Sequence, residues 1–129
     1  MRRLTETEIL GYHLVSPATA RRARVQRVPF LAPGFCGMTL GRLILVLRDD
    51  DRSGRRALLA HELVHVEQCA RLGAARFLWS YVVEYARNRR RGSGHRQAYA
   101  AVSFEVEARA AAARWRTQST RGATAESSA

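Results

Sequence analysis

The stretch from Leu58 to Leu72, LLAHELVHVEQCARL, constrains the fold more than any other part of the chain. Its pattern predicts one helix, on which His61 and His65 share a face because they stand at positions i and i+4. Two imidazoles placed in this way can bind one zinc ion. Glu62 of the same H-E-x-x-H pattern lies about 100° round the helix, close enough to act on a water at the metal. The pattern therefore predicts a metal site on a helix.

On a helical wheel, the apolar side chains and the histidines of this stretch fall on nearly opposite sides. The apolar side holds Leu59, Leu63, Val66 and Ala70, and the other side holds His61, His65, Gln68 and Leu72. The histidines are thus not on the face that apolar residues would bury first. Two interpretations stay open, a metal site and a solvated polar face, and we favour the metal site.

Length and composition indicate one small domain. The chain has 129 residues, of which 47% are apolar, and a net charge of +11 carried entirely by arginine. A basic patch can attract nucleic acid or anionic membrane nonspecifically, but the absence of lysine points to GC-rich coding rather than to a phosphate-binding surface. Cys36 and Cys69 are too few for a disulfide framework. No apolar run reaches the roughly 18 residues of a membrane span, and no signal peptide is evident. We expect a cytoplasmic protein.

Turn signals and hydrophobic patterns divide the rest of the chain. We expect a short helix over Glu8–Leu14, with Thr5 and Glu8 as a capping box and Pro17 ending it. An extended piece lies within Arg21–Val28, and Gly41–Leu47 is the clearest strand. The three aspartates that follow, Asp49 to Asp51, read as a solvated turn rather than a calcium loop.

Two further helices follow the H-E-x-x-H helix, which Gly73 ends. The first, about Ala75–Arg90, is rich in aromatic residues that we assign to the core. The second covers about Arg96–Trp115 and is rich in alanine. The predicted class is α+β, with short N-terminal strands packed on the metal helix and these two helices. One domain spans residues 1–116, and residues 117–129 form a tail that we expect to be disordered.

A catalytic zinc usually has three protein ligands, so one more must come from elsewhere in the chain. The candidates downstream are Glu84, His95, Glu105 and Glu107. On the third helix Glu105 borders the alanine-rich side, whereas Glu107 falls on the polar side. A carboxylate directed into an apolar seam is costly unless it meets a cation. We therefore choose Glu105, with Glu107 as the fallback; Cys69 is a less favoured alternative.

HELVHVEQ followed by FEVEARA resembles the gluzincin type of zinc peptidase, over about Thr39 to Ala112. In that group a Glu on a later helix, often with Ala three places on, is the third ligand, and Glu105 with Ala108 matches. The resemblance implies a minimal zincin-like domain, with Gly41–Leu47 as the edge strand over the cleft. The sequence departs from the family at Glu67, where an apolar residue is usual. It departs again at Arg109, where many members carry an Asp that orients a metal-bound histidine.

The resemblance implies a zinc metallopeptidase acting on a peptide or an unfolded protein. Zn2+ would be held by His61, His65 and Glu105, and Glu62 would activate a zinc-bound water. His95 and Tyr99 are candidate transition-state donors, although a structural role is favoured for each. Two alternatives stay open: a catalytically inactive, zinc-bound interaction module, and an Arg-rich nucleic-acid-binding domain. The second ranks last, because no recognised nucleic-acid module is present.

Overall fold

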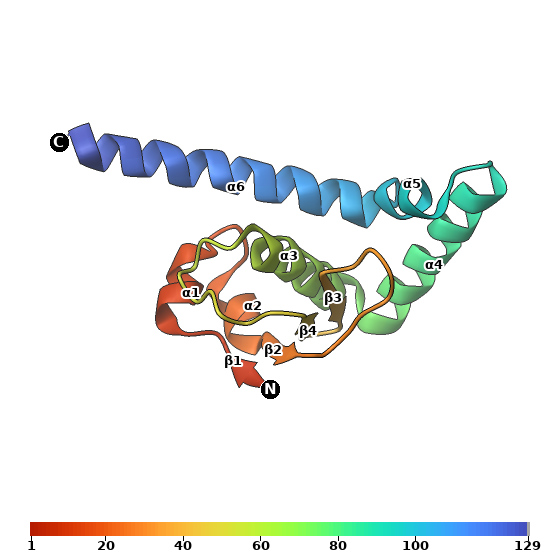
Figure 1. The fold of residues 1–129 in the computed structure, drawn as a ribbon, viewed down its shortest axis with the longest axis horizontal. Coiled ribbons are helices and arrows are strands. Elements are labelled where there is room, and N and C mark those ends of the chain that lie inside the picture. Colours follow the sequence, from red (N-terminus) through yellow and green to blue (C-terminus); the bar gives the residue numbers. More distant parts are fainter. Residues whose placement is uncertain (129) are drawn as a thin grey trace.

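A four-stranded mixed sheet forms the N-terminal layer of the molecule (Figure 1). The computed structural model describes the backbone of residues 1–128 and side chains as far as Arg121. The strands are β1 (Arg2–Arg3), β2 (Arg24–Arg27), β3 (Gly37–Leu40) and β4 (Leu43–Val46), in the order β1-β2-β4-β3. β2 and β4 are parallel, and the other two pairs are antiparallel.

The helices lie on one side of this sheet, and α3 is the central element (Figure 1). They are α1 (Glu6–Gly11), α2 (Pro17–Arg22), α3 (Ala57–Leu72), α4 (Ala74–Arg90), α5 (His95–Ala100) and α6 (Ser103–Ser128). α3 packs against β3 and β4 on one side and against α6 on the other. The predicted α+β class, with strands packed on the H-E-x-x-H helix, is confirmed.

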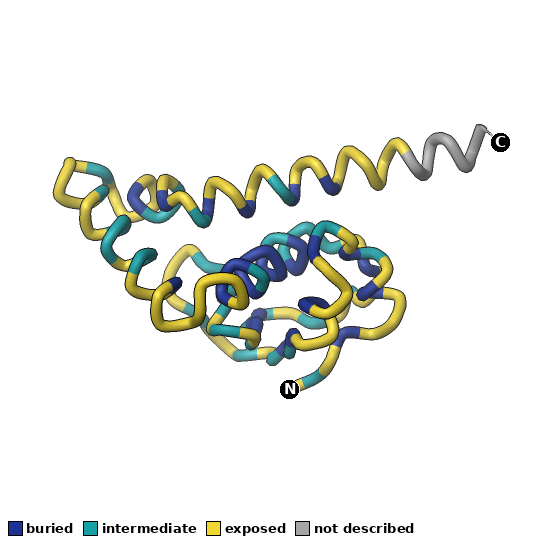
Figure 2. The backbone as a smooth tube through the Cα atoms, turned by 180° about the vertical axis from the view of Figure 1, so that it is seen from behind, coloured by how far each residue is buried: buried dark blue, intermediate teal, exposed yellow. Residues whose placement is uncertain are grey.

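α3 is buried on both of the sides that the helical wheel separated (Figure 2). Leu59 and Leu63 are fully buried in the core, as their pattern predicts. His65 is only 3% exposed and Gln68 is 0% exposed, because α6 covers the second side. The interpretation of that side as a solvated polar face is therefore wrong.

Local signals set most helix boundaries, but the expected end of the first helix and the role of Pro17 are wrong. Thr5 and Glu8 form the predicted capping box, and α1 ends at Gly11, earlier than expected. Pro17 does not end a helix but occupies the first turn of α2, where its missing N–H costs nothing. Ser16 caps this helix by accepting a hydrogen bond from the Thr19 backbone N–H. Gly73 ends α3 with a φ of 87°.

The edge strand of the sheet that packs on α3 is β3, and the sequence does not predict this strand. The clear apolar strand, β4, lies inside the sheet between β2 and β3. The expectation that Gly41–Leu47 is the edge strand over the cleft is therefore wrong. The sequence of β3, Gly-Met-Thr-Leu, does not predict a strand, because it is not enriched in β-branched residues and its polar and apolar residues do not alternate strictly.

The part of the chain after α3 differs in three ways from the expectation. In α4 only Phe77 is buried, and Trp79 is 71% exposed, so its aromatic side chains do not form the core. The predicted third helix is broken at Ala101 and Val102 into α5 and α6. α6 then continues as helix to Ser128 instead of ending near Trp115, so the segment expected to be disordered from residue 117 is helical up to that point.

Trp115 fixes α6 to the N-terminal part of the molecule. Its indole Nε1 donates to the Gly11 carbonyl over 2.8 Å, and its ring packs on Tyr12 with centroids 5.6 Å apart. No described side chain beyond Trp115 is buried. None of the helices described here is both long and apolar enough to cross a membrane.

Candidate metal centre

The fold brings together three side chains whose donor atoms could hold a metal ion. They are His61 and His65 of α3 and Glu105 of α6, and their ligand atoms all lie within 4.8 Å of one another. The two carboxylate oxygens of Glu105 face one histidine each: Oε2 lies 2.9 Å from His61 Nε2, and Oε1 lies 2.7 Å from His65 Nε2. Zinc binds such donors at about 2.0–2.2 Å in a tetrahedral arrangement. The three side chains would therefore have to move closer together to hold one ion.

Gln68 sets the orientation and tautomer of His65. The Gln68 Nε2 donates to the Phe104 carbonyl over 3.1 Å, and a carbonyl can only accept. The Gln68 Oε1 must therefore face the His65 Nδ1, which lies 2.8 Å away and has to donate its proton. The lone pair of a neutral His65 is then on Nε2, the nitrogen that faces the cluster.

The Nε2 of His65 is a buried polar atom without a directed hydrogen-bond partner. Glu105 Oε1 is close in distance, but the direction is wrong for a hydrogen bond, and a carboxylate is itself an acceptor. Two acceptors held at this distance require a cation between them, either a proton or a metal ion. The donor set of two histidines and one glutamate is a common set for zinc. The residues present therefore fit a metal ion.

Electrostatics in the cluster show the same need for positive charge. Burial opposes the charge of Glu105, but its contacts with His61 and His65 outweigh burial and hold the pKa of this carboxyl well below its usual range. Burial alone would lower the pKa of His65, but the Glu105 carboxylate beside it raises that pKa overall. The lowered pKa of Glu105 and the raised pKa of His65 have the same cause: a buried carboxylate and a positive charge stabilise each other.

Glu62 lies beside the cluster and is held by β3. Its Oε2 accepts a hydrogen bond of 2.6 Å from the Thr39 hydroxyl, which also donates to the Glu62 backbone carbonyl over 3.2 Å. Burial raises the pKa of Glu62 above its ordinary value. A carboxyl with a raised pKa exchanges protons nearer to neutral pH, as a general base requires.

The close approach of β3 to Glu62 depends on Gly37. This residue is buried, and a Cβ added there would lie 3.0 Å from Leu58 and 3.4 Å from Glu62 Oε1. Any larger side chain would press on the helix that carries the histidines. Glycine thus lets the edge strand pass close to the carboxylate.

Two tyrosines, Tyr81 and Tyr99, lie on the other side of the cluster. Tyr81 of α4 donates from its hydroxyl to Glu105 Oε1 over 3.1 Å. Burial, and then the Glu105 charge, raise the pKa of both Tyr81 and Tyr99, so both remain protonated donors. His95 pairs instead with the Tyr85 hydroxyl, 2.7 Å from its Nδ1. Of the two donors considered from sequence, Tyr99 lies at the cluster and His95 is engaged in this pair.

The remaining ligand candidates lie away from the cluster. Glu107 is exposed and pairs with Arg71 over 3.0 Å, and Glu84 accepts from the Ser103 hydroxyl over 2.6 Å. Cys69 is buried and lines a different pocket, beside Gly41. Cys36 is free too, so the two cysteines do not pair.

The two departures from the gluzincin pattern have structural explanations. The Glu67 carboxylate accepts from the Ser16 backbone N–H over 3.0 Å and ties α3 to the start of α2. Arg109 donates to the Ala100 carbonyl over 2.7 Å and does not orient a histidine. Gln68, rather than Arg109, orients His65.

Gln68, Thr39 and Tyr81 were not assigned to the site from sequence. The helical wheel places Gln68 on the histidine face, and its position three residues after His65 indicates that the two side chains can interact. Thr39 and Tyr81 come from a strand and a helix whose packing on α3 has no local signature.

No protein-family model, curated protein or solved structure matches this chain. The chemistry of the site therefore has to be read from its geometry and its donor atoms.

Proposed function

We propose that this chain is a zinc-dependent metallopeptidase of the gluzincin type, which hydrolyses peptide bonds in flexible or unfolded segments. The observation that carries the proposal is the buried Glu62 carboxylate beside the cluster of His61, His65 and Glu105. A site that only held a metal would not need a second carboxylate there. Burying an additional acid is costly unless it serves a purpose.

In this proposal His61, His65 and Glu105 hold the metal. When bound, zinc would act as a Lewis acid that polarises a peptide carbonyl and lowers the pKa of water towards about 7. Glu62 would accept a proton from the attacking water and pass it to the leaving amine. Thr39 would orient the Glu62 carboxylate for both transfers, and its hydrogen bond to Oε2 leaves Oε1 for the proton.

Zinc content is the first test. We expect one zinc per chain in the wild type and a large loss in His65→Ala and Glu105→Ala. Glu107→Ala is the matched control, because Glu107 stands on the same helix but is exposed and faces Arg71. A wild type that binds no zinc when zinc is offered would contradict the proposal.

Glu62→Gln separates the enzyme from an inactive zinc-bound module. Glutamine keeps the shape of the side chain but cannot accept the proton. We expect full zinc occupancy and wild-type stability, with hydrolysis of a peptide library reduced by at least about a hundredfold, as is usual for loss of acid–base catalysis. Equal activity of the two proteins would overturn the assigned role of Glu62.

A further inference from the structure

The cleft that contains the three-residue cluster has two arms of opposite chemical character. Glu62, Tyr99 and Glu105 line both arms, so the arms meet at the cluster. We call the part between β3 and α4 the apolar arm; its walls include Met38, Leu40, Phe77, Leu78, Tyr81 and Val82. We call the part beneath α6 the arginine arm; its walls include His61, Arg109 and Arg116.

The apolar arm is a cavity of about 300 Å³. Three of its wall residues leave large apolar surfaces in contact with water: Leu40 is 52% exposed, Leu78 57% and Val82 49%. Covering such a concave surface is favourable by about 25 cal/mol per Å² of apolar area. A bulky aliphatic or aromatic side chain has the size and chemistry to fill it.

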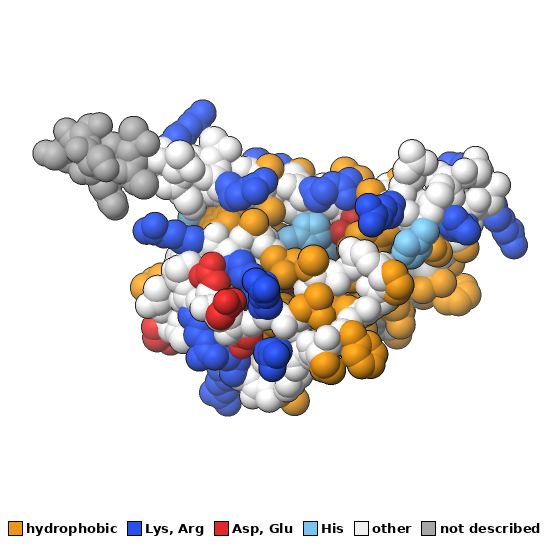
Figure 3. Space-filling view, in the orientation of Figure 1, with side chains coloured by type: hydrophobic (Ala, Val, Ile, Leu, Met, Phe, Trp, Pro, Cys, Tyr) orange, Lys and Arg blue, Asp and Glu red, His pale blue; other side chains and the backbone are white. Residues whose placement is uncertain are grey.

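The arginine arm is larger, about 540 Å³, and carries Arg109 and Arg116 in addition to the Glu62 and Glu105 carboxylates at the cluster. Arg109 binds a backbone carbonyl, and among the described residues neither Arg109 nor Arg116 forms an ion pair with a carboxylate. Figure 3 shows arginine side chains along α6 above the central groove, with apolar side chains gathered on the side nearer to α4. A substrate group on this side meets positive charge.

We infer that the site selects an extended peptide segment with a bulky apolar side chain on one side of the cluster and an acidic group on the other. This inference rests on the proposed function, because it describes which peptide the metal cluster acts on. Glu62 and Glu105 line both arms, so one extended segment that passes the cluster enters both. The net charge of +11 would also attract an acidic peptide in the encounter.

Binding and hydrolysis are measured separately, so that the two proposals fail in different ways. Fluorescence anisotropy with zinc-loaded Glu62→Gln protein gives affinities for synthetic eight-residue peptides that are not consumed. Each peptide has a central pair of alanines with Phe on one side and Glu on the other, and both orders are made. In the matched versions of each peptide, Ser replaces Phe or Lys replaces Glu. We expect one order to bind about tenfold more tightly than either matched version.

Two pairs of variants, made in the Glu62→Gln chain, assign the preference to the arms. Val82→Arg should remove the preference for Phe over Ser, whereas Val106→Arg, at a valine of nearly equal exposure (48%) on α6 outside the cleft, should keep it. Arg116→Glu should reverse the preference for Glu over Lys, whereas Arg114→Glu, on the same helix outside the cleft, should keep it. All four substitutions are at exposed positions, so the proteins should fold, and zinc content and circular dichroism verify this.

Affinities within about twofold for all peptides, or equal effects of a variant and its control, would overturn the inference. Hydrolysis of peptides without preference would also overturn it, while leaving the metallopeptidase proposal intact. Selective binding by the Glu62→Gln protein without hydrolysis by the wild type would support the inference and contradict the peptidase activity.

Discussion

Gln68 is the residue whose role in the site is easiest to isolate. Its Oε1 accepts a hydrogen bond from the His65 Nδ1, and its Nε2 donates to the Phe104 carbonyl, so it links α3 to α6. Gln68→Leu should weaken zinc affinity by about 10- to 100-fold, the usual effect of losing the group that orients a ligand histidine. Titration against a competing chelator measures this change.

Gln97→Leu is the control for that substitution, because Gln97 is an exposed residue of α5. It should leave zinc affinity unchanged. If Gln68→Leu binds zinc as tightly as Gln97→Leu does, the hydrogen bond to Nδ1 does not set the orientation of His65.

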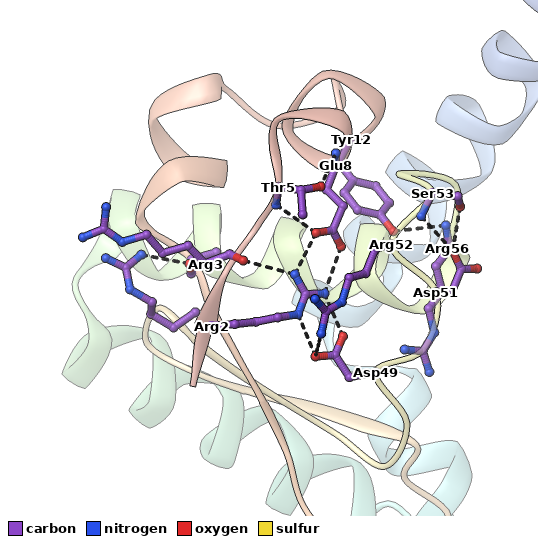
Figure 4. A network of polar contacts seen from close by, with 12 residues as sticks. Arg2, Arg3, Thr5, Glu8, Tyr12, Asp49, Asp51, Arg52, Ser53 and Arg56 are labelled. Atoms are coloured by element: carbon purple, nitrogen blue, oxygen red, sulfur yellow. Dashed lines mark hydrogen bonds and ion pairs between the residues drawn. The ribbon is translucent and has the colours of Figure 1, made fainter.

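A second residue-scale prediction concerns the dependence of stability on pH. Arg2 lies between the carboxylates of Glu8 and Asp49, at 2.7 Å and 2.6 Å (Figure 4). Burial opposes the charge of Glu8, but Arg2 and Thr5 outweigh it, and the hydrogen bond from Arg2 lowers the pKa of Asp49, so both pKa values lie below their ordinary range. The stabilisation is complete above the ordinary carboxyl pKa of about 4 and is lost as pH falls through the lower folded values.

Arg2→Met should reverse this dependence. Without its partner, the fully buried Glu8 has a pKa raised by burial, so the folded state loses stability as pH rises through that value. Thermal unfolding from about pH 3 to about pH 7, the range in which carboxyls titrate, shows the change of slope. Arg21→Met is the control: Arg21 pairs with Glu6 at the surface, where ion pairs contribute little.

At the scale of residues, the sequence predicts those site residues whose proximity follows from helical spacing. His61, Glu62 and His65 are close because they lie on one helix, and Glu105 could be preferred over Glu107 because only one of them borders the alanine-rich side. Thr39 and Tyr81 could not be found in this way. Their positions depend on how β3 and α4 pack on α3, which is not a local property.

At the scale of elements, α6 supplies Glu105 from its first turn and is anchored near its middle by Trp115. Trp115→Ala should lower the free energy of unfolding by about 3 to 5 kcal/mol, as for other buried aromatic truncations, and should also weaken zinc binding. Urea unfolding with and without zinc measures both effects. Trp79→Ala is the matched control, since this tryptophan is 71% exposed, and its loss should leave both quantities nearly unchanged.

The contact between α1 and the loop before α3 depends on two glycines. A Cβ at Gly11 would clash with the Gly54 carbonyl, and one at Gly54 would lie 2.8 Å from the Thr7 carbonyl. Gly11→Ala should therefore destabilise the fold by about 1 to 3 kcal/mol, the usual cost of overpacking. Gly94→Ala meets open space and should be close to neutral, and thermal unfolding compares the two. Equal stability of these variants would show that α1 and the loop can separate without cost.

The elements that sequence missed are those without a local signature. β1 and β3 are short strands at the two edges of the sheet, and each pairs with a single neighbouring strand. The break between α5 and α6 falls in an alanine-rich run with good helix propensity, so nothing in the local sequence marks it. The exposed apolar face of α4 was assigned to the core because a pattern shows which residues are apolar but not what covers them.

For the whole molecule, the metal should act as a clamp between α3 and α6. A ligand that binds only the folded state stabilises it by about 2.7 kcal/mol at a concentration about 100 times its Kd. Removing zinc with a chelator should lower the unfolding temperature of the wild type, and adding zinc back should restore it. Glu105→Ala should unfold at the same temperature with and without zinc, and a response like that of the wild type would contradict the clamp.

The proposed ligands lie on α3 and on α6, with the whole of α4 and α5 between them in the chain. During synthesis both histidines leave the ribosome well before Glu105 does. A nascent chain thus holds two of its three proposed metal ligands at a time when the nearest peptides are its own unfolded segments and those of its neighbours. Placing the third donor so late would delay the proposed hydrolysis until α6, which completes the proposed site, has been made.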